Sequence, residues 1–250
     1  MIIFRKDQLE AFNSVADTDF ERILVGKLVE LFPRSKSAYG APALGQMVRG
    51  SLANARKLGL EREEDILRYL GSVMLLGSGF DTDPQLRWAA GALLTPAGAP
   101  APQRVAALWE QTRSYANRVN GADNRFYATA LRSLEGKTVE TLLSGASRSS
   151  RDLFMLLSTI HPQKVQETGE SAIHDLTRFA VESCRTWEIL DRECVAVMTV
   201  LMFLFGAGMM SDPLTAWAPE ALKKAGAAAT ERKLELLLGA AAQAAGRIAG

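Results

Sequence analysis

Apolar residues recur three or four positions apart along nearly the whole chain, as in Phe20, Ile23, Leu24, Leu28 and Leu31. This spacing places side chains on one face of an α-helix. No stretch shows the sustained two-residue alternation with β-branched residues that is typical of a strand. The pattern therefore predicts an all-α protein.

The same pattern predicts helices over residues 5–15, 19–32, 42–58, 61–76, 84–94, 102–118, 122–134, 137–145, 149–160, 170–186, 190–205, 213–224 and 229–248. The intervening segments are short and contain the Gly and Pro residues that commonly end or begin helices. The chain is thus expected to be a succession of helices joined by tight turns.

The second half of the chain repeats the first at an offset of 129 residues. Over residues 22–93 and 151–222, roughly a quarter of the ungapped pairs are identical, where average composition predicts about four identities. The repeat predicts two tandem copies of one helical module, over residues 1–120 and 130–250, with residues 121–129 as connector. Residues 22–93 and 151–222 should superpose. The identical pairs include Pro33 with Pro162, Gly40 with Gly169, Asp83 with Asp212, Pro84 with Pro213 and Trp88 with Trp217.

Both copies contain the motif Asp-Pro-x-x-x-Trp, at residues 83–88 and 212–217. Asp accepts a hydrogen bond from a free N–H at a helix start, and Pro is favoured at the first helical position. Asp83 and Asp212 are therefore predicted to be N-caps rather than ligand groups. Trp88 and Trp217 are predicted to lock the following helix to the core, unless one is exposed in a groove and contacts a partner.

Two Arg-Glu combinations also recur between the copies, Arg56 with Glu64 and Arg185 with Glu193. An antiparallel helical hairpin that turns near residues 59–60 would bring position 56 opposite positions 63–64. The spacing favours a structural ion pair in each copy, and anion binding by the Arg residues is the alternative.

Composition excludes several classes of protein. The chain is 48% hydrophobic and 23% charged, with 29 Lys and Arg against 28 Asp and Glu. These are ordinary globular values, and the mixed charges form no basic stripe for nucleic acid. Charged residues from Arg5 to Asp7 interrupt any signal-peptide core, so a cytoplasmic location is expected.

No residue pattern indicates a catalytic, cofactor-binding or metal site. The two cysteines, Cys184 and Cys194, are expected to be buried thiols, and the two histidines, His161 and His174, belong to no recognised motif. His174 and Cys184 could not meet within one helix, because ten residues separate them by ~15 Å along its axis. A non-enzymatic protein is therefore predicted.

Residues 194–210 contain no charged side chain, which is close to the minimum length of a membrane span. The equivalent segment of the first copy contains Arg68. A buried central helix is therefore predicted, with a helix that enters membranes only when triggered as the alternative.

Residues 8–93 resemble a family of small bacterial proteins encoded beside type VI secretion spike and effector genes. The resemblance rests on Gln8, Phe12, Phe32-Pro33, residues 55–66, residues 76–84 and Trp88-Ala89. The chain departs from the family pattern at residues 57–60, Lys-Leu-Gly-Leu, and at Arg87, where Pro is usual.

The resemblance implies a role in effector handling. The first expectation is an adaptor or chaperone that binds a secreted effector or spike component. An immunity protein that neutralises a cognate toxin is the alternative, and a membrane-active helical toxin is a weaker one. The partner's surface is expected to lie between the modules, near residues 95–130.

Overall fold

The computed structural model describes residues 6–94, 98–144, 149–189 and 191–250, with side chains described for residues 18–93 and from residue 98 onward within these ranges. The described residues form fourteen α-helices and three 3-10 helices, and contain no strand. The predicted all-α class is confirmed.

The helices divide along the chain into two similar series. The first comprises α1 (Lys6–Leu31), α2 (Ser35–Tyr39), α3 (Ala41–Lys57), α4 (Glu63–Leu76), η1 (Pro84–Leu86), α5 (Arg87–Leu94) and α6 (Ala101–Asn120). A connecting group follows, η2 (Ala122–Asn124), α7 (Arg125–Arg132) and α8 (Val139–Leu143). The second series comprises α9 (Ser150–Ile160), α10 (Pro162–Thr168), α11 (Glu170–Thr186), α12 (Arg192–Phe205), η3 (Pro213–Thr215), α13 (Trp217–Ala225) and α14 (Thr230–Ala249).

The bounds of these helices recur at the spacing found in the sequence. Helices α3, α4, η1 and α6 begin and end 129 residues before α11, α12, η3 and α14. Glycines with positive φ stand at equivalent turns, at Gly40 and Gly169 (81° and 77°) and at Gly77 and Gly206 (93° and 95°). The common origin of the two series stays a prediction.

Three details of the predicted helices were wrong. The two helices predicted over residues 5–15 and 19–32 form the single helix α1 over the described residues 6–31, because no Gly or Pro interrupts the polar residues between them. The short helices α2 and α10 were not predicted. They have five and seven residues, which is too short for an apolar period to stand out.

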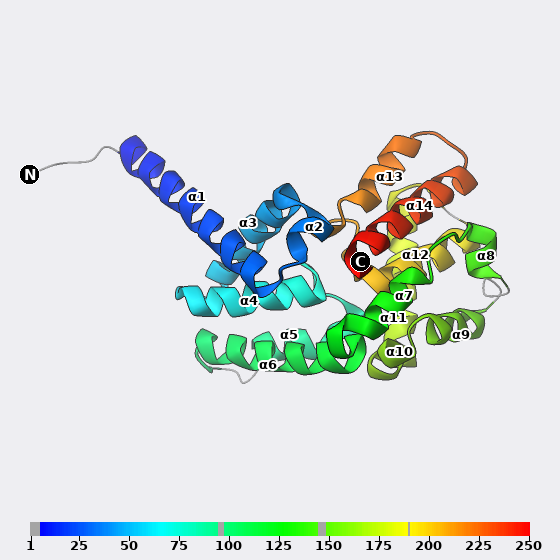
Figure 1. The fold of residues 1–250 in the computed structure, drawn as a ribbon, viewed down its shortest axis with the longest axis horizontal. Coiled ribbons are helices and arrows are strands. Elements are labelled where there is room, and N and C mark those ends of the chain that lie inside the picture. Colours follow the sequence, from blue (N-terminus) through cyan, green and yellow to red (C-terminus); the bar gives the residue numbers. More distant parts are fainter. Residues whose placement is uncertain (1–5, 95–97, 145–148, 190) are drawn as a thin grey trace, which may run out of the picture.

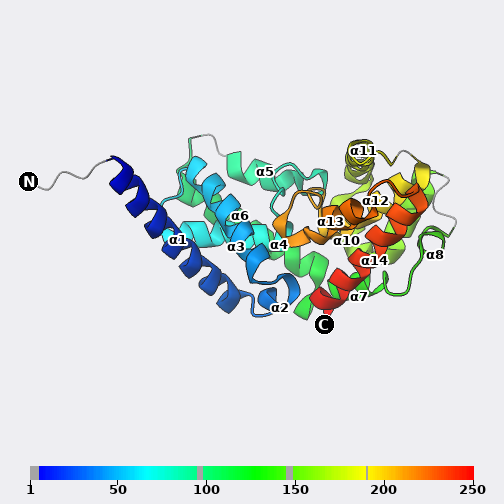
Figure 2. The same ribbon diagram turned by 90° about the horizontal axis from the view of Figure 1, so that it is seen from above.

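Two apolar cores correspond to the two series of helices. One contains buried residues between Leu24 and Val119, and the other contains buried residues between Ala130 and Ala249. The two halves lie side by side along the long axis of the molecule, and α1 extends outward from the first half (Figures 1 and 2). The C-terminal end of α14 lies near the middle of the molecule, against α2.

Helix α12 lies inside the second core, as predicted for the uncharged run. Residues 196–205 are all buried. Within the part of the chain that the structure describes, no helix combines the length and apolarity needed to cross a bilayer.

Candidate functional site

Two equivalent aspartates, one in each half, bind the backbone of the opposite half in the same way. One carboxylate oxygen of Asp83 accepts a hydrogen bond from the N–H of Gln85 (2.9 Å), and the other accepts one from the N–H of Ala207 in the second half (2.8 Å). Asp212 accepts from the N–H of Leu214 (2.9 Å) and from the N–H of Ser78 in the first half (2.7 Å). Each aspartate therefore caps its own 3-10 helix and binds the turn of the other half.

These turns come very close to each other. A Cβ atom at Gly79 would lie 3.7 Å from the Cα atom of Gly208, and a Cβ atom at Gly208 would lie 3.6 Å from the Cα atom of Gly79. Both distances are ordinary van der Waals contacts, so the two turns pack backbone against backbone at these glycines.

Several elements of each half pack on the other half. Helix η1 contacts α11 and η3 contacts α3, while α2 contacts α14 and α10 contacts α6. The side chain of Gln85 donates to the carbonyl oxygen of Met202 (3.1 Å), and the Leu214 side chain belongs to the first core. On the surface, Arg118 forms two hydrogen bonds with Glu167 (2.7 and 2.9 Å). The halves are thus interlocked rather than loosely linked.

A cavity of about 690 Å³ lies at this junction. It is lined by residues from α1, α2, α4, η1, α6, the connecting group, α10, α12, η3 and α14, and so by both halves. Its volume lies within the range of small-molecule and peptide side-chain sites. Its apolar lining includes Leu31, Phe32, Leu76, Leu86, Leu131, Leu204, Phe205 and Ile248.

The cavity contains one lysine that is largely enclosed by protein. The ammonium of Lys164 donates to the carbonyl oxygen of Phe203 and lies 5.2 Å from the centre of the Phe203 ring. Burial lowers the pKa of Lys164 to about 8, and the charge of Asp83 opposes this shift.

Hydroxyl groups from both halves share the cavity lining with Lys164. Burial raises the pKa of Tyr39 to about 12, and the negative charge of Asp212 adds to the effect. Tyr127 donates to the carbonyl oxygen of Leu204 (3.3 Å). The hydroxyl oxygens of Ser35 and Tyr115 are buried, and that of Tyr115 lies beside Thr168. The lining therefore offers several hydrogen-bond donors within an apolar surround.

The lining residues include no His or Cys, and the carboxylates of Asp83 and Asp212 already accept hydrogen bonds from backbone N–H groups. Among the described residues, no group of three or more His, Cys, Asp and Glu is placed to hold a metal ion.

The motif residues predicted from the sequence contribute mainly to structure. Asp83 and Asp212 are N-caps, as predicted. The hydrogen bonds that they accept from the other half were not predicted. Pro84 and Pro213 open 3-10 helices that precede α5 and α13. Both Trp rings are partly buried: Trp88 packs on Tyr115 (5.5 Å between ring centres) and Trp217 packs on Phe205 (5.0 Å).

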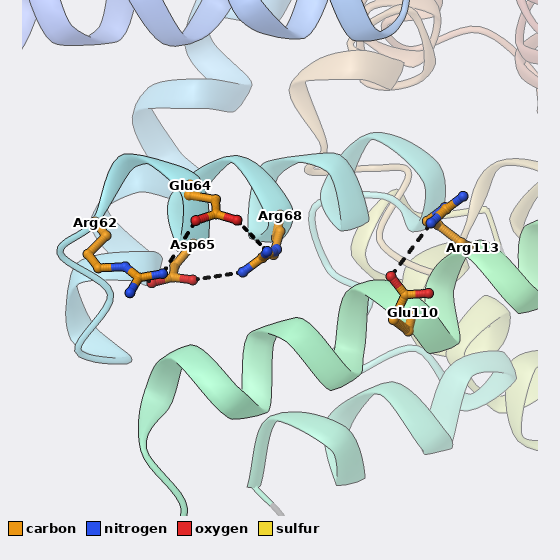
Figure 3. A network of polar contacts seen from close by, with 6 residues as sticks. All are labelled: Arg62, Glu64, Asp65, Arg68, Glu110 and Arg113. Atoms are coloured by element: carbon orange, nitrogen blue, oxygen red, sulfur yellow. Dashed lines mark hydrogen bonds and ion pairs between the residues drawn. The ribbon is translucent and has the colours of Figure 1, made fainter.

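The predicted Arg-Glu pairs between helices were wrong for the described residues. Glu64 pairs with Arg62 and Arg68 at the start of its own helix, where the fully buried Asp65 also binds both arginines (Figure 3). Arg185 pairs with Glu182, one turn earlier in α11. Glu64 and Arg185 thus each pair with a residue of opposite charge that is nearby in the sequence, and not with the predicted residue on the other helix of the hairpin.

The two cysteines are buried, as predicted, and their proximity was not foreseen. Cys184 and Cys194 are unoxidised, with their sulfur atoms 3.0 Å apart. Cys194 occupies the position equivalent to Asp65, so the second hairpin has a thiol pair where the first has a buried carboxylate.

Sequence reasoning also missed the residues that give the cavity its chemistry, namely Lys164, Tyr39, Tyr115 and Tyr127. The available signal was a difference between the copies, because Lys164 stands where the first copy has Ser35.

A comparison with family models, curated proteins and solved structures gives no match. The resemblance to the type VI secretion-associated family therefore stays a prediction.

Proposed function

We propose that this protein is a non-enzymatic adaptor that binds a segment of another protein, an effector or spike component of type VI secretion, in the cavity between its halves. The cavity itself is the observation on which the proposal depends. It lies between two interlocked helical units and has an apolar lining. Helical proteins commonly take up a partner's segment in such a groove.

The position of the cavity supports this proposal. Residues 119–132, which lead from the first half to the second, provide a large share of its lining. Exposed lining residues, Leu31 and Arg125 among them, form a rim that a bound segment could contact. Apolar and Arg anchors of this kind are enriched in protein interfaces.

Co-purification with a tagged full-length chain from the organism that encodes it tests the proposal. Ala128, which lines the cavity from α7, is partly buried. Ala128→Trp should fill part of the cavity and abolish capture of the partner. Ala53→Trp, at an exposed position of α3 away from the lining, is the matched control and should leave capture unchanged. Melting curves must show that both variants are folded.

Deletion of the gene then separates the roles. Lost delivery of the effector without self-killing supports the adaptor, whereas self-killing of the deletion strain indicates an immunity protein. Failure to capture any protein, together with permeabilisation of liposomes by the pure chain, would reject the binding function and favour a membrane-active toxin.

A further inference from the structure

The ammonium of Lys164 has an incomplete set of partners. Its described contacts are the carbonyl oxygen and the ring of Phe203, and neither is a carboxylate. Asp83 is the negative group that influences Lys164, but its oxygens already accept hydrogen bonds from Gln85 and Ala207. An ammonium has three N–H donors, and the partly buried ammonium of Lys164 has one described acceptor. A ligand in the cavity with a negative acceptor would complete this set.

The other polar groups of the cavity favour the same kind of ligand. The hydroxyl-bearing residues Ser35, Tyr39, Tyr115 and Tyr127 line the cavity that Lys164 lines. Hydroxyls and an ammonium can all donate, and a carboxylate can accept several such bonds.

The exposed residues at the rim of the cavity also favour a negatively charged ligand. The exposed charged side chains of this rim are Arg34, Arg125, Arg132 and Asp123, so three are positive and one is negative. Such a rim favours the approach of an acidic segment. Leu31 lies on the same rim with 59% of its surface exposed and offers an apolar contact beside the arginines.

We infer that the occupant of the cavity is an apolar segment of the partner protein that carries an acidic residue, whose carboxylate binds the ammonium of Lys164. The inference rests on the proposed function and specifies its ligand chemistry. The apolar side chains of the segment occupy the space between Phe32, Leu204 and Ile248. Lys164 is thus the residue that selects an acidic segment over a neutral one.

Octanoate and 1-octanol test this inference, because they share an apolar chain and differ in the carboxylate. In NMR titrations of the full-length protein, octanoate should bind at least about tenfold more tightly than 1-octanol, the difference expected for a charge-assisted hydrogen bond. Octylammonium should bind no better than 1-octanol. Equal affinities for octanoate and 1-octanol would overturn the inference without the use of any variant.

Lys164→Met should remove the preference for octanoate and leave the affinity for 1-octanol within about threefold. Lys36→Met is the matched control, since Lys36 is exposed on α2, the helix equivalent to α10, and does not line the cavity. Lys164→Met should melt at a temperature no lower than that of the wild type, because a partly buried charge with no described ion pair has been removed. A preference for octanoate that persists in Lys164→Met would overturn the inference.

The proposed function and the inference can fail separately. In one outcome the wild type binds octanoate more tightly than 1-octanol, Lys164→Met does not, and no protein is captured. The cavity is then a site for a free acid, and both the adaptor function and the assignment of the acid to a partner protein are rejected. If a protein is captured equally well by wild type and Lys164→Met, the adaptor function stands and Lys164 is not its selecting residue.

Discussion

A buried polar residue at the junction of the halves can accept hydrogen bonds from backbone groups of its own half and of the other half. Asp83 shows this most clearly. It caps η1 and binds the N–H of Ala207 across the junction. A cap contributes about 1 kcal/mol, and a hydrogen bond to a charged group contributes about 1.5–3 kcal/mol.

Asp83→Ala should therefore lower the free energy of unfolding by about 2–4 kcal/mol, more than the loss of a cap alone. Asp81→Ala, two residues earlier and exposed, should change it by less than about 0.5 kcal/mol. Urea unfolding followed by circular dichroism measures both variants. An Asp83→Ala effect no larger than that of Asp81→Ala would contradict the double role.

His161 makes stability depend on pH. Burial, followed by the charge of Lys164, lowers its pKa from 6.5 to about 4, and the neighbouring Gln163 opposes the shift only in part. The unfolded chain therefore binds a proton near pH 6.5 that the folded chain does not bind until about pH 4. This contribution to stability is complete above pH 6.5 and is lost as the pH falls towards 4.

Between pH 7 and pH 5 the loss from His161 should be about 2 kcal/mol. His161→Phe, which introduces the residue found at the equivalent position Phe32, should remove this slope. His174→Gln, at an exposed position on α11, should retain it. Urea midpoints measured at several pH values compare the two variants, and an unchanged slope in His161→Phe would show that other groups are responsible.

At the level of elements, the helix bounds depend on a few turns with unusual backbone geometry. Gly77 ends α4 with φ of +93°, and a Cβ atom there would lie 3.4 Å from a carboxylate oxygen of Asp212. Residues other than Gly are strained in this region of φ. The position of the Asp212 carboxylate therefore depends on this glycine.

Gly77→Ala should destabilise the protein by about 1–3 kcal/mol. Gly91→Ala, within α5 and with no atom within 4 Å of the added Cβ, should be neutral or stabilise it by up to about 1 kcal/mol. Thermal unfolding of the two variants gives the comparison. Equal destabilisation by both substitutions would mean that backbone strain at Gly77 is not the cause.

The sequence predicts the elements well where the signal is local. The Asp-Pro caps, the buried helix α12 and the long helices follow from cap residues and apolar period. Contacts between distant elements leave no such signal. The bond from Asp83 to Ala207 spans 124 residues, and the cavity combines Ser35, Tyr115 and Lys164, which have no common spacing. The predicted ion pairs failed for a related reason, because Glu64 and Arg185 each have a partner of opposite charge nearby on the same segment.

For the whole molecule, the interlocked junction predicts that the halves associate without a peptide bond between them. Residues 1–120 and 121–250, expressed together with a tag on one fragment, should co-purify as a one-to-one complex. The fragments should pair less tightly when Asp83→Ala and Asp212→Ala are combined, since both reciprocal bonds are then absent. Two fragments that remain separate and individually folded would contradict an interlocked junction.

The reciprocal bonds have a consequence for the history of such a protein. Asp83 accepts a hydrogen bond from the N–H of Ala207, and Asp212 accepts one from the N–H of Ser78. The two acceptors are 129 residues apart, and so are the two donors. An isologous contact of this kind is what relates the subunits of a two-fold homodimer. A chain of half the length could thus have formed this interface with a second copy of itself. Under the predicted duplication, fusion of such subunits is what would allow one position to become Lys164 while its counterpart became Ser35, so that the two halves line the cavity differently.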